Sequence, residues 1–415
     1  MKTLFAGVNR VTGDIRMQPI LSIDDISRIL LSICRSAVQE HTSMPLHKLE
    51  EDSSRSIVSL LEGTTILPMA IAAHVSTMFQ CPALADVLCG DDSIEHWAGA
   101  IYHEWSQAPA IITFITSGST GKPTQQKLES VLLWQEAQEL QRTLLHERKR
   151  IVSTVPCHHV YGFLFTVLLP KVAEIPCLIP VPFPSRAFIE ELKDGDFIVS
   201  FPLFWNGLIK LGIPFPANTH GSTSTAPCSP ETMHQLLSLG LARISNIYGS
   251  SETGGLGFQH HPDAPLTLFN FWQRVRCDDI ENSWIERVHP LDIPQPPVAI
   301  PDFVEWFSHE LFAVRGRKDK IVQVGGINVS LLKTAACIKQ HPDVLDCAVR
   351  LMRPDEGNRL KAFILPRSFE PDTIALRAEL YQWCRNRLRP AERPKKITFG
   401  NQFPVNAMGK AKDWN

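Results

Sequence analysis

The sequence lacks the features that mark several large classes of protein. No stretch approaches the roughly 20 apolar residues that a membrane-spanning helix requires. Acidic and basic residues nearly balance at a formal net charge of −2, so the basic excess typical of nucleic-acid-binding proteins is missing. Residues 1–16 contain no apolar block, and we therefore expect no signal peptide. These absences favour a globular protein without a membrane span or a nucleic-acid partner.

The ten cysteines include no C-x-x-C pair. Their scatter matches neither a zinc site nor a disulfide framework. Several lie in apolar surroundings, as Cys177 and Cys347 do, where a reduced cysteine behaves as a small hydrophobic residue. We therefore expect a cytoplasmic protein in a reducing compartment.

A Walker A loop is also missing, although residues 114–125 read FITSGSTGKPTQ. A Walker A loop has four residues between its glycines and then Lys-Ser or Lys-Thr at the start of a helix. Here two residues separate Gly118 from Gly121, and Pro123 after Lys122 disfavours a helix. Backbone N–H groups and hydroxyls in such a loop still suit an anion. The alternatives are a phosphate loop of another nucleotide enzyme and a surface turn.

From residue 111 onward, strand-like and helical segments alternate. This alternation predicts βαβ units and a largely parallel sheet with helices on its faces. The expected strands are 111–115, 151–155, 177–181, 197–201 and 244–248, and the expected helices are 129–147, 186–193 and 230–239. Ligands bind beyond the carboxyl ends of such strands. The polar loops at 116–123 and 248–257 are expected there.

The predicted fold class is α/β, with two domains. Residues 1–317 would form a large α/β domain, and residues 318–415 a small mobile α+β domain. Residues 260–300 are rich in proline and are expected to be irregular. In the small domain we expect strands at 321–324 and 397–399, helices at 331–340 and 373–388, and a hairpin over 344–365.

Four separated segments together resemble the adenylate-forming superfamily. They read TSGSTGKP at 116–123, YGSSETG at 248–254, GRKDKIVQVGGINVS at 316–330 and PVNAMGK at 404–410. This superfamily includes acyl- and aryl-CoA synthetases, acyl-carrier-protein ligases and peptide adenylation domains. The compact length resembles ligases of aryl polyene or pigment assembly. The resemblance runs from residue 108 to the end, and no motif is recognised before it.

The resemblance implies a two-step ATP-dependent ligase. A carboxylate, aryl (hydroxybenzoate-like) or fatty, would react with MgATP to give acyl-AMP and pyrophosphate. The phosphopantetheine thiol of CoA or of an acyl carrier protein would then take the acyl group and release AMP. The basic stretch 385–396 could meet an acidic carrier protein, or be a solvated face. A noncatalytic relative that binds nucleotide or ligand as a regulator or scaffold is the alternative function.

The resemblance also assigns residues to the phosphates and the metal. Glu252 would hold Mg²⁺, a hard cation that prefers oxygen ligands. Lys410 would contact the carboxylate and the α-phosphate, where a cation stabilises developing negative charge. His159 would lie beside the carboxylate pocket, with simple packing at a strand end as the alternative. The phosphate-binding residues would be Thr116, Ser117, Gly118, Ser119, Thr120, Gly121, Lys122 and Ser251.

A third group would contact adenine, ribose and the thiol arm. The adenine and ribose residues would be Thr225, Ala226, Pro227, Tyr248, Gly249, Asp302 and Arg317. The Asp302 assignment departs from the family pattern, because Ile300-Pro301 replaces the usual Thr-Gly, and a loop or N-cap role is the alternative. Asp319 matches the hinge position. Gly325 and Gly326 would let the phosphopantetheine arm approach the backbone.

Overall fold

The structure is a computed structural model. It describes residues 21–41, 66–82, 93–106, 111–116, 124–179, 183–250, 253–275, 283–317, 321–324, 327–353, 356–357, 359–368, 372–404 and 413–414. Among these residues, no helix combines the length and the apolar character needed to cross a bilayer.

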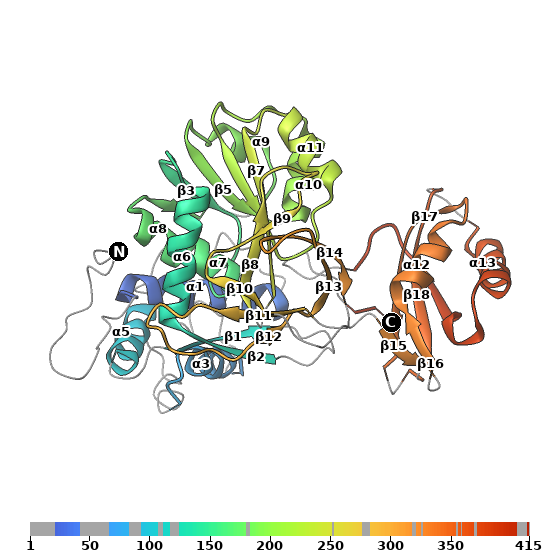
Figure 1. Ribbon diagram of the computed structural model, residues 1–415, viewed down its shortest axis with the longest axis horizontal. Helices are drawn as coiled ribbons and strands as arrows, with labels where there is room; N and C mark the ends of the chain where they lie inside the picture. Colours follow the sequence, from blue (N-terminus) through green and yellow to red (C-terminus); the bar gives the residue numbers. More distant parts are fainter. Residues whose placement is uncertain are drawn as a thin grey trace.

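A nine-stranded mixed sheet lies at the centre of the larger unit (Figure 1). Its order is β13 (Asp302–Trp306), β14 (Leu311–Arg317), β9 (Leu266–Leu268), β8 (Gly254–Gln259), β7 (Arg243–Ser250), β6 (His220–Thr223), β5 (Asp196–Ser200), β3 (Arg150–Ser153) and β4 (Cys177–Leu178). Strands β4, β3, β5, β6 and β7 run parallel to one another. Strands β8, β9, β14 and β13 follow in antiparallel pairs. Every residue of β5 is buried, as expected for a parallel strand covered on both faces. The predicted α/β class is confirmed.

Helices cover this sheet. They are α6 (Ser130–Leu144), α7 (Val160–Phe163), α8 (Leu169–Ala173), α9 (Arg186–Glu190), α10 (Pro202–Leu211) and α11 (Pro230–Ser238), with a π-helical turn at Leu164–Leu168. Helix α11 begins as its sequence predicts. The Ser229 hydroxyl accepts a hydrogen bond from the Thr232 N–H, and Pro230 occupies the first turn.

Three helices without a recognised motif pack onto the same core. They are α1 (Ile23–His41), α3 (Ile66–Met78) and α5 (Ile94–Trp105). Arg28 of α1 donates a hydrogen bond to the Thr166 carbonyl at 3.2 Å, and Asp25 forms an ion pair with Lys171. This N-terminal region is therefore part of the larger unit.

The strand before the 116–123 loop does not join the main sheet, and this expectation was wrong. Strand β1 (Ile111–Thr116) pairs antiparallel with β2 (Thr124–Glu129) in a separate hairpin. The connection is too short for a parallel crossover, which needs a dozen or more residues. The stretch expected to be irregular also contains strands, because β10 (Trp272–Val275), β11 (Trp284–Arg287) and β12 (Val298–Ala299) form a separate three-stranded sheet.

The second unit, orange to red in Figure 1, has its own apolar clusters around Ile338 and Val329. Its elements are β15 (Ile321–Val324), β16 (Ile327–Ser330), α12 (Leu331–Lys339), β17 (Val344–Leu351), β18 (Leu360–Pro366), α13 (Thr373–Arg387), a 3₁₀ turn (Pro390–Glu392) and β19 (Pro394–Phe399). The predicted element order is therefore confirmed, with β16 added. A domain boundary between residues 317 and 318 remains our proposal, since 318–320 lie outside the described residues.

Candidate functional site

Three residues assigned to adenine and ribose lie together at one edge of the large unit. The hydroxyl of Tyr248, near the end of β7, donates a hydrogen bond to Asp302 Oδ2. Asp302 is only 4% exposed and is the register partner of Arg317 across the β13–β14 ladder. Residues far apart in the sequence thus meet at one place. Asp302 is a buried strand residue, not a loop residue or an N-cap.

The loop of Thr225, Ala226 and Pro227 follows β6, the parallel neighbour of β7. Ser224 ties this loop to β7, because its hydroxyl donates to the Ile247 carbonyl at 2.9 Å. Thr225 has a φ of +75°, an unfavourable conformation for a β-branched residue that is usually kept only at functional sites. Its buried hydroxyl has no hydrogen-bond partner among the described residues. A strained backbone and an unsatisfied hydroxyl favour a ligand-binding role for the loop.

Gly249 has to be a glycine, because β7 and β8 approach each other closely here. It pairs with Gly255, and a Cβ at Gly249 would lie 2.3 Å from the Gly254 carbonyl oxygen. The Ser250 and Thr253 hydroxyls lie 3.1 Å apart on either side of Ser251 and Glu252. The glycine of the Tyr-Gly pair is therefore required by the close approach of the two strands.

The two histidines after β3 differ in their surroundings. His158 is buried, and its Nδ1 shares a hydrogen bond of 2.8 Å with the Ser32 hydroxyl of α1. Burial, helped by His159 and His74, holds the pKa of His158 well below 6.5, so its ring is neutral near pH 7. His159 is half-buried, with its ring centroid 4.2 Å from that of His158. Sequence reasoning missed Ser32 and His74, because their helices carry no recognised motif.

The predicted phosphate loop is described only at its two ends. Thr116 and Thr124 are register partners, so the chain leaves and re-enters the β1–β2 hairpin at one place. Likewise Val324 and Ile327 pair on either side of the two glycines of the thiol-arm prediction. The following predicted residues lie outside the described residues and stay predictions: Ser117, Gly118, Ser119, Thr120, Gly121, Lys122, Ser251, Glu252, Asp319, Gly325, Gly326 and Lys410.

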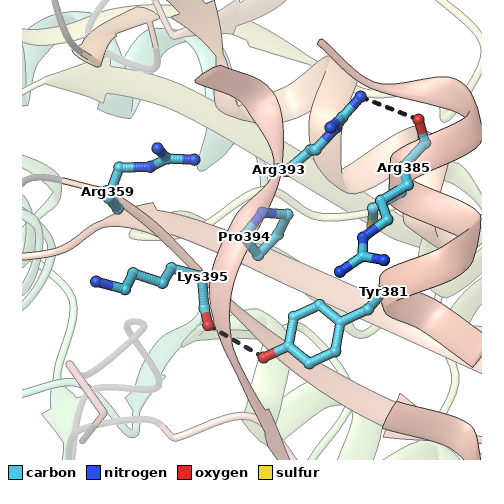
Figure 2. A pocket seen from close by; sticks show the side chains of 7 residues that line it. Arg359, Tyr381, Arg385, Arg393, Pro394 and Lys395 are labelled. Carbon is cyan, nitrogen blue, oxygen red and sulfur yellow. Dashed lines mark hydrogen bonds between the residues drawn. The ribbon is translucent and has the colours of Figure 1, made fainter. Parts of the chain in front are cut away.

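A basic pocket of about 460 Å³ opens on the second unit (Figure 2). Four cationic side chains line it, and no carboxylate does: Arg359, Arg385, Arg393 and Lys395. The Arg359 Nε is buried without a hydrogen-bond partner among the described residues. Arg393 and Tyr381 donate to the carbonyls of Arg385 and Lys395, both at 3.0 Å. This arrangement suits an anionic ligand.

Comparison with known families decides the identity. The AMP-binding enzyme family matches residues 43–271, more than half of the chain, and its C-terminal domain family matches residues 334–410. The chain belongs to the AMP-binding enzyme family. It is therefore an adenylate-forming ligase by family, as the four sequence segments predicted.

Curated members of this family cover most of the chain. The 4-coumarate–CoA ligase of Halorhodospira halophila is 35% identical over 74% of this chain and 76% of its own length. The 4-coumarate–CoA ligase of Rhodobacter capsulatus is 32% identical over 73% and 75%.

Solved structures share the fold at low sequence identity. An ATP-bound chimera of MatB and BclM superposes with a TM-score of 0.61 at 16% identity, covering 92% of this chain and 91% of its own. O-succinylbenzoate coenzyme A synthetase from Bacillus subtilis, in complex with AMP, gives a TM-score of 0.54 at 14% identity, over 74% and 72%. These similarities establish the fold of the AMP-binding family.

Proposed function

We propose that this protein is an AMP-forming acid–thiol ligase that activates an aryl carboxylic acid and transfers it to CoA. The observation that carries the proposal is the hydrogen bond of Tyr248 to the buried Asp302, the register partner of Arg317, beside the loop of Thr225. A tyrosine hydroxyl, a buried carboxylate and the buried hydroxyl of Thr225 are groups that suit the ribose and base of a nucleotide. The family membership makes ATP that nucleotide.

The remaining roles are proposals from the family pattern. The loop at 117–122 would hold the β- and γ-phosphates, and Glu252 would hold Mg²⁺, which neutralises phosphate charge when bound. The carboxylate oxygen would attack the α-phosphorus, and the bond to pyrophosphate would break. Lys410 would stabilise the charge on the α-phosphate during this step. The thiolate would then attack the acyl carbon, and AMP would leave.

The acid is proposed to be a hydroxycinnamate, because relatives at 35% and 32% identity are named 4-coumarate–CoA ligases. A hydroxybenzoate or a fatty acid is the second choice. The aromatic residues after β5 do not decide this point. Phe204 and Trp205 are 2% and 0% exposed, and Trp205 packs on Phe215 and Gly221 in the core.

The basic pocket on the second unit supports a phosphate-bearing thiol donor. Both CoA and a phosphopantetheinylated carrier protein are anionic near the thiol arm. CoA is the proposed acceptor because the relatives are named CoA ligases. An acyl carrier protein, as in aryl polyene assembly, is the alternative, and transfer assays with each acceptor distinguish them. Both steps would take place in the cytoplasm.

Carboxylate-dependent exchange of labelled pyrophosphate into ATP tests the proposal. The panel contains hydroxycinnamates, hydroxybenzoates, fatty acids and amino acids. We expect exchange with one aryl acid, and its loss by at least about a hundredfold in Lys410→Ala, because one preorganised donor contributes on that scale. Circular dichroism checks that Lys410→Ala is folded, so that a loss of exchange reports on activity alone.

Lys339→Ala is the control, because Lys339 is an exposed lysine of the second unit that pairs with Asp346 at 3.0 Å. It should exchange at the wild-type rate. Full exchange by Lys410→Ala would contradict the role of Lys410. No exchange by folded wild-type protein with any acid would favour the noncatalytic nucleotide-binding alternative.

A further inference from the structure

A buried carboxylate lies behind the turn between β7 and β8, on a residue that no motif includes. Glu136 of α6 is 2% exposed, and its Oε1 accepts a hydrogen bond from the Gly255 N–H at 2.7 Å. Its Oε2 lies 3.8 Å from Nη1 of Arg287, which is itself 8% exposed. Charged side chains are almost never this buried unless they are paired. The pair therefore needs an explanation beyond ordinary packing.

Both backbone polar groups of Gly255 are held by side chains. The Glu136 carboxylate accepts a hydrogen bond from the Gly255 N–H, and the indole Nε1 of Trp272 donates one to the Gly255 carbonyl at 2.8 Å. Gly255 is the register partner of Gly249, next to the bulge that follows Tyr248. Glu136 and Trp272 therefore determine where the end of β7 lies.

The glycines of the turn leave room for this carboxylate. A Cβ at Gly254 would lie 2.7 Å from Glu136 Oε2, and a Cβ at Gly255 would lie 2.6 Å from Oε1. Gly254 also has a φ of +70°. The Gly254-Gly255 pair is therefore matched to Glu136, and the turn could not keep this path with larger residues.

Arg287, which pairs with Oε2 of this carboxylate, also donates hydrogen bonds to two residues of α6. Its Nη2 donates to the Leu132 carbonyl at 2.6 Å, and its Nε donates to Gln135 Oε1 at 3.1 Å. Its guanidinium also lies 4.3 Å from the ring centroid of Phe271. One ion pair thus connects α6, β8 and β11.

Helix α6 also connects to the phosphate loop. It starts at Ser130, directly after β2, and the first residue of β2 pairs with Thr116 at the start of the loop. The same helix is therefore joined to the phosphate-loop hairpin at its beginning and to the Tyr248–Gly255 turn at Glu136. These are the two segments that must face one nucleotide under the proposed function.

Burial of the pair is costly. Desolvation raises the pKa of Glu136 to about 7, although Arg287 and the Gly255 N–H act in the opposite direction. Apolar residues of similar size often replace such a pair without loss of stability. Stability alone therefore does not account for the charges.

We propose that Glu136 and Arg287 are a positioning pair, which aligns the Tyr248–Gly255 turn with the phosphate-loop hairpin and so sets the affinity for ATP. Neither residue needs to touch the nucleotide, because the effect of the pair reaches the site through Gly255 and α6. The inference rests on the proposed function in taking ATP as the ligand.

The test compares Glu136→Gln with the double variant Glu136→Gln/Arg287→Met. The glutamine keeps an acceptor for Gly255, and the double variant leaves no buried unpaired charge, so it should fold even where the single variant does not. Glu139→Gln is the matched control, one turn further along α6, where Glu139 pairs with exposed Arg142 at 2.6 Å.

Two quantities are measured on folded protein: the Kd for ATP by calorimetry without acid, and the KM values for ATP and acid in pyrophosphate exchange. We expect the Kd and KM for ATP to rise about tenfold or more in the double variant, with the KM for the acid unchanged, because a small misplacement is costly at a reacting site. A purely structural role would lower the stability and the yield of folded protein, and it would leave the Kd and KM for ATP of the folded protein unchanged.

The outcomes separate this inference from the proposed function. Wild-type ATP affinity in a folded double variant overturns the positioning role and leaves the ligase function intact. Absence of exchange in wild type, with ATP binding weakened by the double variant, overturns the ligase function and supports the positioning role. Absence of ATP binding in wild type overturns both.

Discussion

At His158, burial sets the protonation state of a side chain inside the larger unit. Its pKa in the folded protein lies below the ordinary value of 6.5 because of desolvation and the neighbouring His159 and His74 rings. The unfolded chain therefore binds a proton below pH 6.5 that the folded protein excludes. The stability due to the neutral ring is full above pH 6.5 and is lost as the pH falls below it.

Replacement of His158 by asparagine should flatten this dependence. Asparagine keeps a polar atom within reach of the Ser32 hydroxyl but does not titrate. Below pH 6.5, we expect the free energy of unfolding of wild type to fall more steeply than that of His158→Asn. The difference in slope is up to about 1.4 kcal/mol per pH unit. Urea unfolding at several pH values measures this difference. The exposed His146 serves as control through His146→Asn, and parallel profiles for wild type and His158→Asn would contradict the neutral buried ring.

The other residues of the site could be predicted only in part. The motifs drew attention to Tyr248 and Thr225, and the structure places Tyr248 within hydrogen-bonding distance of Asp302, whose own segment departs from the family pattern. Glu136 gave a weaker signal, since it falls on the otherwise apolar stripe of α6 with Leu133, Ala137 and Leu140. Such a position predicts a buried charge but does not name its partner, which lies 119 residues away.

At the scale of elements, the segment PCHHVYG shows why a motif has its spacing. Helix α7 turns back so closely on the strand end that a Cβ at Gly162 would lie 1.9 Å from the Pro156 carbonyl oxygen. Tyr161 then reaches across the sheet, and its hydroxyl lies 2.8 Å from Ser222 Oγ. The glycine permits the close turn, and the tyrosine anchors α7 to β6.

Gly162→Ala should therefore be strongly destabilising. The obstacle is backbone, which cannot move as a side chain can, so we expect a loss of about 3 kcal/mol in the free energy of unfolding. Gly99→Ala in α5 is the control, because nothing lies within 4 Å of its added Cβ. There we expect a gain of about 0.5–1 kcal/mol. Equal stabilities of the two variants in chemical denaturation would contradict this account.

At the scale of the whole molecule, an ion network holds the end of the chain to the second unit. Arg350 lies 2.6 Å from both Glu356 and Asp413, and its guanidinium lies 5.1 Å from the Trp414 ring centroid. Lys361, with a fully buried side chain, lies 2.8 Å from Glu356 and donates to the Trp414 carbonyl at 3.0 Å. All of these contacts join residues between positions 350 and 414.

Arg350→Met should lower the stability of the second unit alone. Glu356, Asp413 and the Trp414 carbonyl all lose a partner, and with Arg350 15% exposed we expect a loss of about 2 kcal/mol. Calorimetry should show one transition moving down while that of the larger unit stays in place. Arg353→Met is the control, because Arg353 is 48% exposed and contacts the same carboxylates at 3.6 and 3.4 Å. A loss of at most about 1 kcal/mol is expected there. Movement of both transitions in Arg350→Met would contradict independent units.

Local patterns in the sequence predict the α/β class, the order of elements in the second unit and the family to which the chain belongs. These follow from local information, namely the period of apolar residues, capping residues and motif spacing. Three contacts are visible only in the folded structure: Asp302 lies opposite Arg317, β1 pairs with β2 outside the main sheet, and Ser32 meets His158 across 126 residues. Strand register and burial depend on contacts between distant segments. No local pattern in the chain specifies which of these segments will meet.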